Sequence, residues 1–511
     1  MSDPIASPYR DVPYLGHAYA ETHPSRLATI ASLYGMEPPN LAACRLLELG
    51  CGRGNNLLPM AYQYPEARFV GIDRSGPAIE AATTLSQGLG RQNLEFRHGD
   101  IMDVTPQWGR FDYIIAHGVY SWVPAEVRTK ILTIFHENLS PQGVAYVSYN
   151  AYPGSHLRNM TRDMMLYHTR STGEPQSRIT QARAILAMVA EGSKAATVHG
   201  AVLRDQLARV RRMPDELLIH DDLLEGTTPF LLHEVVSEAE RHGLQYLSDA
   251  FLWRRDLTQY PEDTRKILDS FPDAEFTARD QYQDFIDGYG FRRTLLCHGE
   301  VELKRRPEPD CIARFHLASS AAPEPGKLDP ASPGMVEFKT EHGDTLATDH
   351  PMTKAALLEL GKAWPGTIGF AELVSAAGMR VGISLEGSGG RSEHVAIMTN
   401  ALYAAVFAGH VEIHKDPLML TTRISHKPQA SPLARKQAEA KSLITNLRHK
   451  SIRIEDEMMR QFLLLVDGTR DIDDLVRNFA ACAPEDGPAD LTRAGVEQNL
   501  RYLADRALLL S

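Results

Sequence analysis

Apolar residues along the first 150 positions fall into short continuous runs separated by stretches with helical spacing. Five runs predict buried strands: CRLLELG (44–50), ARFVGID (67–73), LEFRHGDI (94–101), FDYIIAHG (111–118) and GVAYVSYN (143–150). Between them, segments such as GNNLLPMAYQY and EVRTKILTIFHENL repeat apolar positions every three or four residues. Strands that alternate with helices of this length predict an α/β fold with a parallel sheet and right-handed crossovers.

The pattern changes after Asn150. Residues 155–225 carry amphipathic helical stretches such as ITQARAILAMVAEGSK, and a helix followed by strand-like runs returns in 226–310. We expect one sheet domain, built from 1–154 and 226–310, that is interrupted by a helical insertion at 155–225. The alternative is an independent middle domain from about 155 to 300.

The last third of the chain follows a stretch rich in Ala, Ser, Pro and Gly. This stretch, ASSAAPEPGKLDPASPG (318–334), predicts a linker, which we place at 311–340. Beyond it, 341–511 contains helices followed by short strands, a pattern typical of a winged-helix-like α+β domain. Because this region is not strongly basic, we expect it to contact protein rather than DNA.

Composition narrows the function further. The 511 residues carry a formal net charge of -11 without a long basic run, which disfavours nucleic acid as the main partner. Five cysteines lack CxxC spacing, and no metal-ligand cluster is visible, so we expect reduced thiols and no metal. The N-terminus does not look like a secretory signal, and no apolar run is long enough for a transmembrane segment. A cytoplasmic location is therefore expected.

The segment LLELGCGRGNN is the most informative motif. Gly50, Gly52 and Gly54 form a GxGxG loop directly after a strand that contains Glu48. Glycine permits a positive φ and a close approach of ligand to backbone, and open α/β sheets bind ligands at this edge. A dinucleotide fingerprint requires a third glycine where Asn55 stands, so NAD is the weaker interpretation.

Two acids follow the next two strands. Asp73, with Arg74 beside it, ends the second strand about 20 residues after the loop, where a carboxylate can accept hydrogen bonds from ribose hydroxyls. Asp100 ends the third strand within reach of an adenine amino group, and Ile101 can pack on the purine face. The three features in this order favour a nucleoside-containing ligand.

The pattern resembles class I S-adenosylmethionine-dependent methyltransferases. The segments AYAETHPSRLATIASLYG, VYSWVP, YNAYPG, HGLQYLSDAFL and QYQDFIDGYGFRRTLLCH resemble one bacterial family within that class. The family carries a methyltransferase regulatory domain and includes the rickettsial lysine methyltransferases of outer-membrane proteins. The resemblance implies a Rossmann-like seven-stranded sheet, S-adenosylmethionine as cofactor with S-adenosylhomocysteine as product, and protein lysine N-methylation. It also implies a helical middle region that takes part in forming a homodimer, and a C-terminal domain that shapes the substrate site.

Residue roles follow from the same resemblance. The glycine loop borders the methionine part of the cofactor, Asp73 holds the ribose, and Asp100 with Ile101 holds the adenine. His117 and Gly118, after strand four, face the sulfonium, while Glu48 either touches the ligand or orders the loop. The ETHP segment either closes over the cofactor, with Tyr14, Tyr19 and His23 lining it, or caps the helix that begins at Pro24. The candidate cofactor-binding residues are Glu48, Gly50, Gly52, Gly54, Asn55, Asp73, Arg74, Asp100, Ile101, His117, Gly118 and His23.

Tyr120 and Trp122 follow strand four on the acceptor side and are the candidate catalytic residues. A lysine must lose its proton before methylation, and a desolvated aromatic slot suits its apolar stem and lowers its pKa. The Asn/Asp-Pro-Pro-aromatic motif of amide and base methyltransferases is missing here. We expect Tyr120 to face the transferred methyl and Trp122 to wall the channel, with a core role for Trp122 as the alternative.

Two other functions stay open. The acceptor loop also fits a small-molecule N- or O-methyltransferase with an amine or hydroxyl substrate. The third possibility is a non-catalytic cofactor-binding scaffold, whose C-terminal modules would recruit partners.

Overall fold

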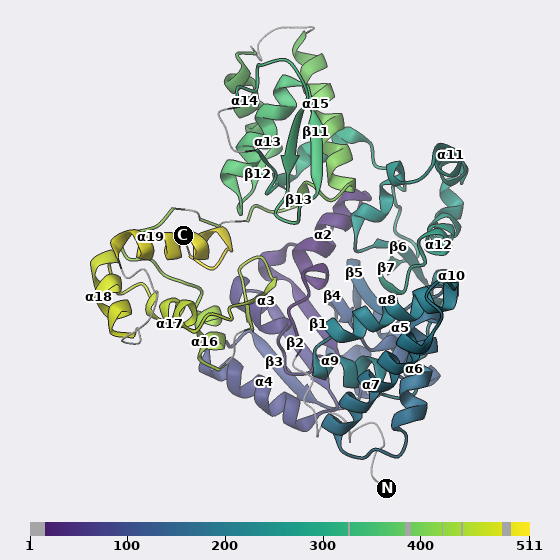
Figure 1. Ribbon diagram of the computed structural model, residues 1–511. Coiled ribbons are helices and arrows are strands. Elements are labelled where there is room, and N and C mark those ends of the chain that lie inside the picture. The colour runs from purple at the N-terminus through teal and green to yellow at the C-terminus, as the bar shows by residue number, and fades with distance from the viewer. Residues whose placement is uncertain are drawn as a thin grey trace.

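A seven-stranded sheet forms the centre of the first 300 residues (Figure 1). The computed structural model describes residues 16–324, 328–383, 390–418, 420–421, 423–440, 443–482 and 492–510, with the side chains of 390–392 left out. The strands are β1 (Arg45–Leu49), β2 (Arg68–Asp73), β3 (Leu94–His98), β4 (Phe111–Ala116), β5 (Leu139–Asn150), β6 (Leu244–Asp249) and β7 (Phe291–His298). Their order is β3-β2-β1-β4-β5-β7-β6, so the predicted seven-stranded α/β sheet is confirmed.

The first five strands are parallel, whereas β7 runs antiparallel to both β5 and β6. Helices cover both faces, which explains why β1, β2 and β4 are largely apolar runs, whereas the edge strand β3 alternates and is only partly buried. The helices of this part are α2 (Pro24–Leu33), α3 (Leu57–Gln63), α4 (Gly76–Gly88), α5 (Ala125–Asn138), α10 (Leu232–Arg241), α11 (Glu262–Ser270) and α12 (Phe276–Asp287).

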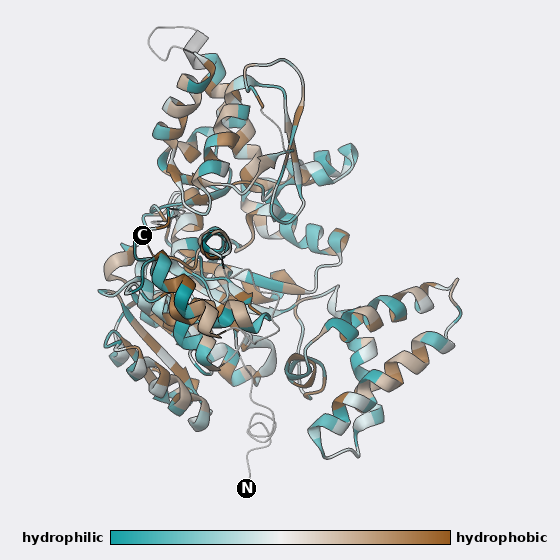
Figure 2. Cartoon of the chain, turned by 60° about the vertical axis from the view of Figure 1, so that its left-hand side comes forward, coloured by the Kyte–Doolittle hydropathy of each residue, from teal (hydrophilic) through white to brown (hydrophobic). Residues whose placement is uncertain are grey.

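Of the helices between β5 and β6 in the sequence, four form a group of their own. They are α6 (Ser155–Thr169), α7 (Pro175–Gly192), α8 (Val198–Arg212) and α9 (Asp215–Asp222). Met165, Leu186, Leu203 and Val210 belong to a hydrophobic cluster confined to this group. In Figure 2 the group stands to the right, away from the rest of the chain. Since β6 and β7 rejoin the sheet, these helices interrupt it in sequence.

The segment 311–340 does not form the linker that its composition suggests. It contains β8 (His316–Ala318), β9 (Ala322–Pro323) and β10 (Val336–Lys339), and the side chains of Phe315, Leu317 and Phe338 are buried. The many Ala, Ser, Pro and Gly residues led the sequence analysis to overlook the few apolar residues on either side of them. These apolar residues pack into the main core. The prediction of a linker was therefore wrong.

Two units follow, where the sequence suggested one domain over 341–511. The middle unit contains β11 (Thr345–Thr348), α13 (Pro351–Ala363), β12 (Ile368–Gly369), α14 (Phe370–Val381), α15 (Gly390–Phe407) and β13 (Glu412–His414), and it shares the main core. The terminal unit contains α16 (Pro432–Ala440), β14 (Leu443–Thr445), β15 (Ser451–Arg453), α17 (Glu457–Leu465), α18 (Ile472–Cys482) and α19 (Arg493–Asp505), and it has its own core. Figure 1 shows the terminal unit in yellow beside α3 and α4.

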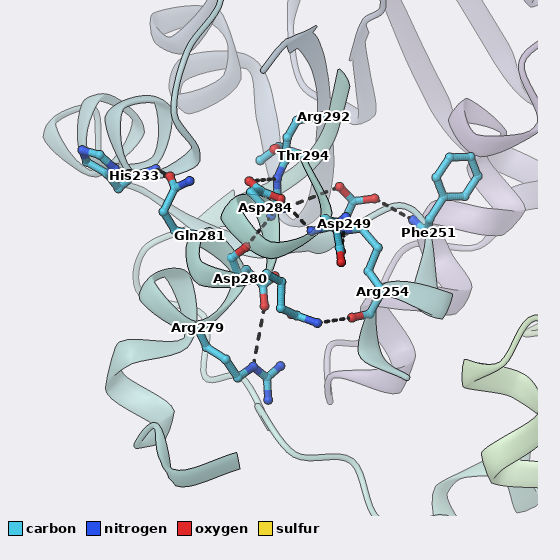
Figure 3. A network of polar contacts seen from close by, with 12 residues as sticks. His233, Asp249, Phe251, Arg254, Arg279, Asp280, Gln281, Asp284, Arg292 and Thr294 are labelled. Carbon is cyan, nitrogen blue, oxygen red and sulfur yellow. Dashed lines mark hydrogen bonds and ion pairs between the residues drawn. The ribbon is translucent and has the colours of Figure 1, made fainter. Parts of the chain in front are cut away.

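A buried network of charges joins α12 to strands β6 and β7 (Figure 3). The fully buried guanidinium of Arg292 donates from Nε and Nη2 to the two carboxylate oxygens of Asp284, at 2.9 and 2.8 Å. Arg254 donates to the same carboxylate at 2.6 Å, and Asp249 lies 3.5 Å from Arg292. These contacts hold α12 against β7. The next residue, Arg293, reaches the opposite side of the strand and pairs with Glu21 at 2.9 Å.

Among the described helices, none combines the length and the apolar character needed to cross a bilayer.

Candidate functional site

The loop of residues 50–54 connects β1 to α3 at the carboxyl edge of the sheet. Its three glycines have φ values of 77°, 52° and 70°. A Cβ on Gly54 would lie 2.3 Å from the Phe96 ring, and one on Gly50 would lie 2.6 Å from Val119, so both are needed for packing. A Cβ on Gly52 would meet no described atom within 4 Å. Gly52 therefore faces the open space where a ligand can approach the backbone.

Asp73 orders this glycine loop. Its carboxylate accepts hydrogen bonds from the backbone N–H groups of Gly52 and Ser75, both at 2.8 Å. Each carboxylate oxygen retains a second lone pair, so Asp73 can also accept hydrogen bonds from a ligand. The predicted acid at the end of β2 is thus brought against the predicted loop.

The predicted residues Arg74, Asp100 and Ile101 lie just beyond the ends of β2 and β3. The Arg74 guanidinium lies 3.4 Å from the Asp100 carboxylate, and both side chains are partly exposed. Asp100 also accepts a hydrogen bond from the backbone N–H of Met102, which fixes the short turn that contains Ile101. Ile101 is buried. A polar pair and an apolar side chain therefore meet where the sequence analysis expects the nucleoside part of a ligand.

Glu48 lies beneath the glycine loop and is buried. Its Oε1 accepts a hydrogen bond from Asn56 at 2.8 Å, while Oε2 has no hydrogen-bond partner among the described residues. Burial raises the pKa of Glu48 to about 8, so the group is mostly protonated at neutral pH. The neighbouring Asn55 donates to the carbonyl of Gly16 at 3.3 Å, which ties the loop to the N-terminal segment, residues 16–23.

Asn56 is a central residue that the sequence analysis missed. Its Oδ1 accepts hydrogen bonds from the Tyr19 N–H at 3.0 Å and from Nε2 of His449 at 2.9 Å. Its Nδ2 donates to Glu48 and to the Thr22 hydroxyl. The only sequence signal was an asparagine pair directly after a glycine loop, and that signal does not reveal a partner almost 400 residues later.

His23 caps helix α2, which is one of its two predicted roles. Its Nδ1 accepts from the Ser25 N–H at 3.3 Å, and its Nε2 lies 3.1 Å from the side-chain oxygen of Gln63. Burial lowers the pKa of His23 to about 4, so the ring is neutral. Since both ring nitrogens have protein partners, the structure supports the capping role of His23 and gives no support to its predicted role in cofactor binding. Tyr14, which was considered together with His23, lies outside the described residues.

His117 and Gly118, which the sequence analysis placed on the acceptor side, lie directly after β4. The His117 Nδ1 lies 3.0 Å from the Tyr146 hydroxyl, and the Gly118 N–H donates to Ser148 at 2.8 Å. The ring of Tyr19 packs over His117 with centroids 3.9 Å apart, and Phe291 meets the same ring edge-on at 6.1 Å.

Burial, with the nearby Arg293 charge, lowers the pKa of His117 to about 3. A neutral His117 is therefore surrounded by the rings of Tyr19, Tyr146 and Phe291. The sequence analysis considered Tyr19 as a lining residue but did not select Tyr146 or Phe291, because these two come from the more distant strands β5 and β7.

Tyr120 packs in the core beside this site. It is 3% exposed, and its ring lies 5.4 Å from Phe230 and 6.1 Å from Tyr149. Trp122 is half-buried, with the Arg162 guanidinium 6.0 Å from its ring. We expected both aromatics on one side of an extended turn, but Tyr120–Trp122 is a 3₁₀ turn, in which residues two apart point in different directions. Tyr120 is thus packed as a core residue, which is the role that the sequence analysis considered for Trp122.

Comparison with known families divides the chain into three matched parts. Residues 40–198 match the family described as "Methyltransferase domain", and 214–298 match "Predicted methyltransferase regulatory domain". Residues 426–503 match "PKMT, C-terminal winged helix domain". The last match corresponds to the terminal unit, so the prediction of a winged-helix module at the C-terminus is confirmed.

The chain also matches individual proteins. It is 34% identical to protein RP789 of Rickettsia prowazekii over 502 residues, which are 96% of this chain and 88% of that protein. It is 32% identical over 240 residues to protein RP028 of the same organism, covering 47% of this chain and 96% of the relative. The solved structure of PKMT2 from Rickettsia typhi in complex with AdoHcy superposes with a TM-score of 0.88 at 27% identity, covering 98% of this chain and 100% of that one.

Proposed function

The chain belongs to the family of S-adenosylmethionine-dependent methyltransferases that join a methyltransferase domain to a regulatory domain and a C-terminal winged helix, and on that basis we propose that it methylates lysine side chains of proteins. The likeness to Rickettsia typhi PKMT2 carries this proposal, because it extends over all three parts of the chain rather than over the cofactor-binding sheet alone.

The residues at the carboxyl edge of β1, β2 and β3 suit S-adenosylmethionine. Bound there, this cofactor supplies a reactive methyl group on a positively charged sulfur. We assign its amino-acid end to the open space at Gly52, since no described atom lies within 4 Å of the place where a Cβ of this residue would be. We assign the ribose to Asp73, which keeps lone pairs free, and the adenine to the edge formed by Asp100 and the buried Ile101.

The aromatic residues after β4 suit an alkyl amine as acceptor. The rings of Tyr19 and Phe291 beside His117 offer an apolar lining for a lysine stem. Because His117 is neutral, it does not repel an incoming ammonium group. Exclusion of water by these rings favours the neutral amine, which is the form that can attack a methyl group. The residues of this chain thus select, desolvate and orient the acceptor.

Mass spectrometry of methylated proteins tests the proposal. The enzyme is incubated with S-adenosylmethionine and a panel of bacterial surface proteins, and digested peptides are searched for methyl groups. We expect methylation on lysine, and none in the same proteins after their lysines have been chemically acetylated. Methyl transfer confined to the low-molecular-weight fraction would contradict the proposal and favour a small-molecule methyltransferase.

A further inference from the structure

The hairpin formed by β14 and β15 carries a buried histidine from the terminal unit into the methyltransferase part. Its tip, residues 446–450, brings His449 to the start of α3, and His449 is 3% exposed. His449 Nε2 lies 2.9 Å from Oδ1 of Asn56, the residue that also binds Glu48 beneath the glycine loop. A residue near the end of the chain is therefore one hydrogen-bond step from the candidate cofactor site.

The backbone of the hairpin tip is shaped to point this side chain inward. His449 has a φ of 56°, and within the described residues only Ala507 shares a left-handed φ without being glycine. The side-chain oxygen of Asn446 accepts hydrogen bonds from the N–H groups of Arg448 and Lys450, at 3.0 and 2.8 Å, and so holds the tip in this form. An unfavourable backbone conformation that surrounding contacts maintain is typical of residues with a specific task.

The direction of the hydrogen bond follows from the partners of Asn56. Its Nδ2 donates to both Glu48 and Thr22, so its Oδ1 is the acceptor, and Nε2 of His449 must carry the proton. Burial holds the pKa of His449 well below its ordinary value, so the ring stays neutral and keeps this arrangement at physiological pH.

Two further contacts join the hairpin to the N-terminal segment. Ser451 accepts a hydrogen bond from the backbone N–H of Ala18 at 3.3 Å, and the rings of His449 and His23 lie 4.9 Å apart. Between these points, Tyr19 donates its N–H to Asn56 and places its ring over His117. The hairpin thus borders the segment that covers the acceptor side.

We propose that His449 is a positioning residue through which the terminal unit holds Asn56 in place. Asn56 in turn holds Glu48 beneath the glycine loop and Tyr19 of the N-terminal segment in the arrangement that cofactor binding requires. The inference rests on the proposed function only in taking S-adenosylmethionine as the ligand. In this arrangement the terminal unit completes the cofactor site indirectly, through the hydrogen bond from His449 to Asn56.

Two variants of the full-length chain separate the hydrogen bond from packing and backbone strain. His449→Gln retains an amide N–H donor at about the position of Nε2, whereas His449→Met fills a similar volume without a donor. Neither residue favours a left-handed φ, so both variants carry the same backbone cost. Isothermal titration with S-adenosylhomocysteine and amide hydrogen exchange of the ligand-free protein are measured for both, with urea unfolding as a check on the fold.

We expect His449→Met to bind S-adenosylhomocysteine roughly 10-fold more weakly and His449→Gln to restore most of the affinity. We also expect faster exchange of the Tyr19 amide in His449→Met alone. Equal affinities and unchanged Tyr19 exchange in a folded His449→Met protein would overturn the positioning role. Failure of the wild-type chain to bind the ligand would instead count against the proposed function, and the exchange rates would still decide the role of His449.

Discussion

Oε1 of Glu48 accepts a hydrogen bond from Nδ2 of Asn56 at 2.8 Å, while Oε2 of the same buried group has no partner among the described residues. A carboxyl group in this position is more stable with its proton than without it, because an unpaired buried charge is costly. The glycine loop therefore lies above a neutral Glu48 at physiological pH.

Replacement of Glu48 by glutamine is expected to change how stability depends on pH. The pKa of Glu48 rises from 4.5 in the unfolded chain to about 8 in the folded one. Its contribution to stability is thus present below pH 4.5 and is lost as the pH rises towards 8, by up to ~1.4 kcal/mol per pH unit. Urea unfolding of Glu48→Gln should show a gain over wild type that grows between pH 5 and pH 8. Parallel pH profiles would contradict the raised pKa.

Alanine at Gly52 and at Gly54 is expected to have different consequences. Both positions have a positive φ, which costs about 1–2 kcal/mol for a residue with a Cβ. At Gly54 the Cβ also collides with Phe96, so the total loss is ~2–5 kcal/mol. Gly52→Ala should remain folded in urea titrations but bind S-adenosylhomocysteine at least roughly 10-fold more weakly in calorimetry. Wild-type affinity in Gly52→Ala would exclude the open space at Gly52 as the ligand site.

Substitutions at Tyr120 distinguish a core residue from an acceptor-side one. Tyr120→Phe keeps the ring that packs on Phe230 and Tyr149, so it should retain both stability and kcat/KM. Tyr120→Ala should lose about 3–5 kcal/mol of unfolding free energy, because it leaves a cavity in a buried cluster. A folded Tyr120→Phe enzyme with strongly reduced kcat would restore the role that the sequence suggested.

The network in Figure 3 predicts a large loss of stability for Arg292→Met. This change leaves the carboxylate of Asp284 buried with a weakened set of partners, at a cost of about 3–5 kcal/mol. Arg306→Met is the matched control, since Arg306 pairs with Asp273 at an exposed site and should lose at most about 1 kcal/mol. Urea unfolding of the two variants tests the difference. Similar losses in both would show that the buried pair adds little beyond an exposed one.

Local patterns were enough to predict the five parallel strands and the glycine loop, whereas the seven-stranded sheet was expected from the family resemblance. Strands β1, β2 and β4 are largely apolar runs because both faces of the sheet are covered, and the φ values at Gly50, Gly52 and Gly54 depend on the local turn. The position of Asp73 could also be predicted, because a carboxylate at the end of β2 must lie beside the loop at the end of the neighbouring strand β1.

Contacts between residues far apart in the sequence could not be predicted. The pairing of Asn56 with His449 depends on how the terminal unit docks, and no periodicity encodes that. The packing of Tyr120 in the core was not predicted, because the sequence does not distinguish an extended turn from a 3₁₀ turn. The segment 311–340 was misjudged because its small residues outnumber the few apolar ones that anchor it, Phe315, Leu317 and Phe338.

The antiparallel pairing of β5 with β7 has a consequence for synthesis of the protein. The last eight residues of β5 are buried in the finished sheet, yet β7 emerges from the ribosome only after the whole helical group. During that interval β5 offers an unpaired apolar edge to other nascent chains, which is a known hazard for aggregation. The helical group has its own core and can fold in the meantime, so an arrest of translation just before β7 leaves a folded arm on an open sheet.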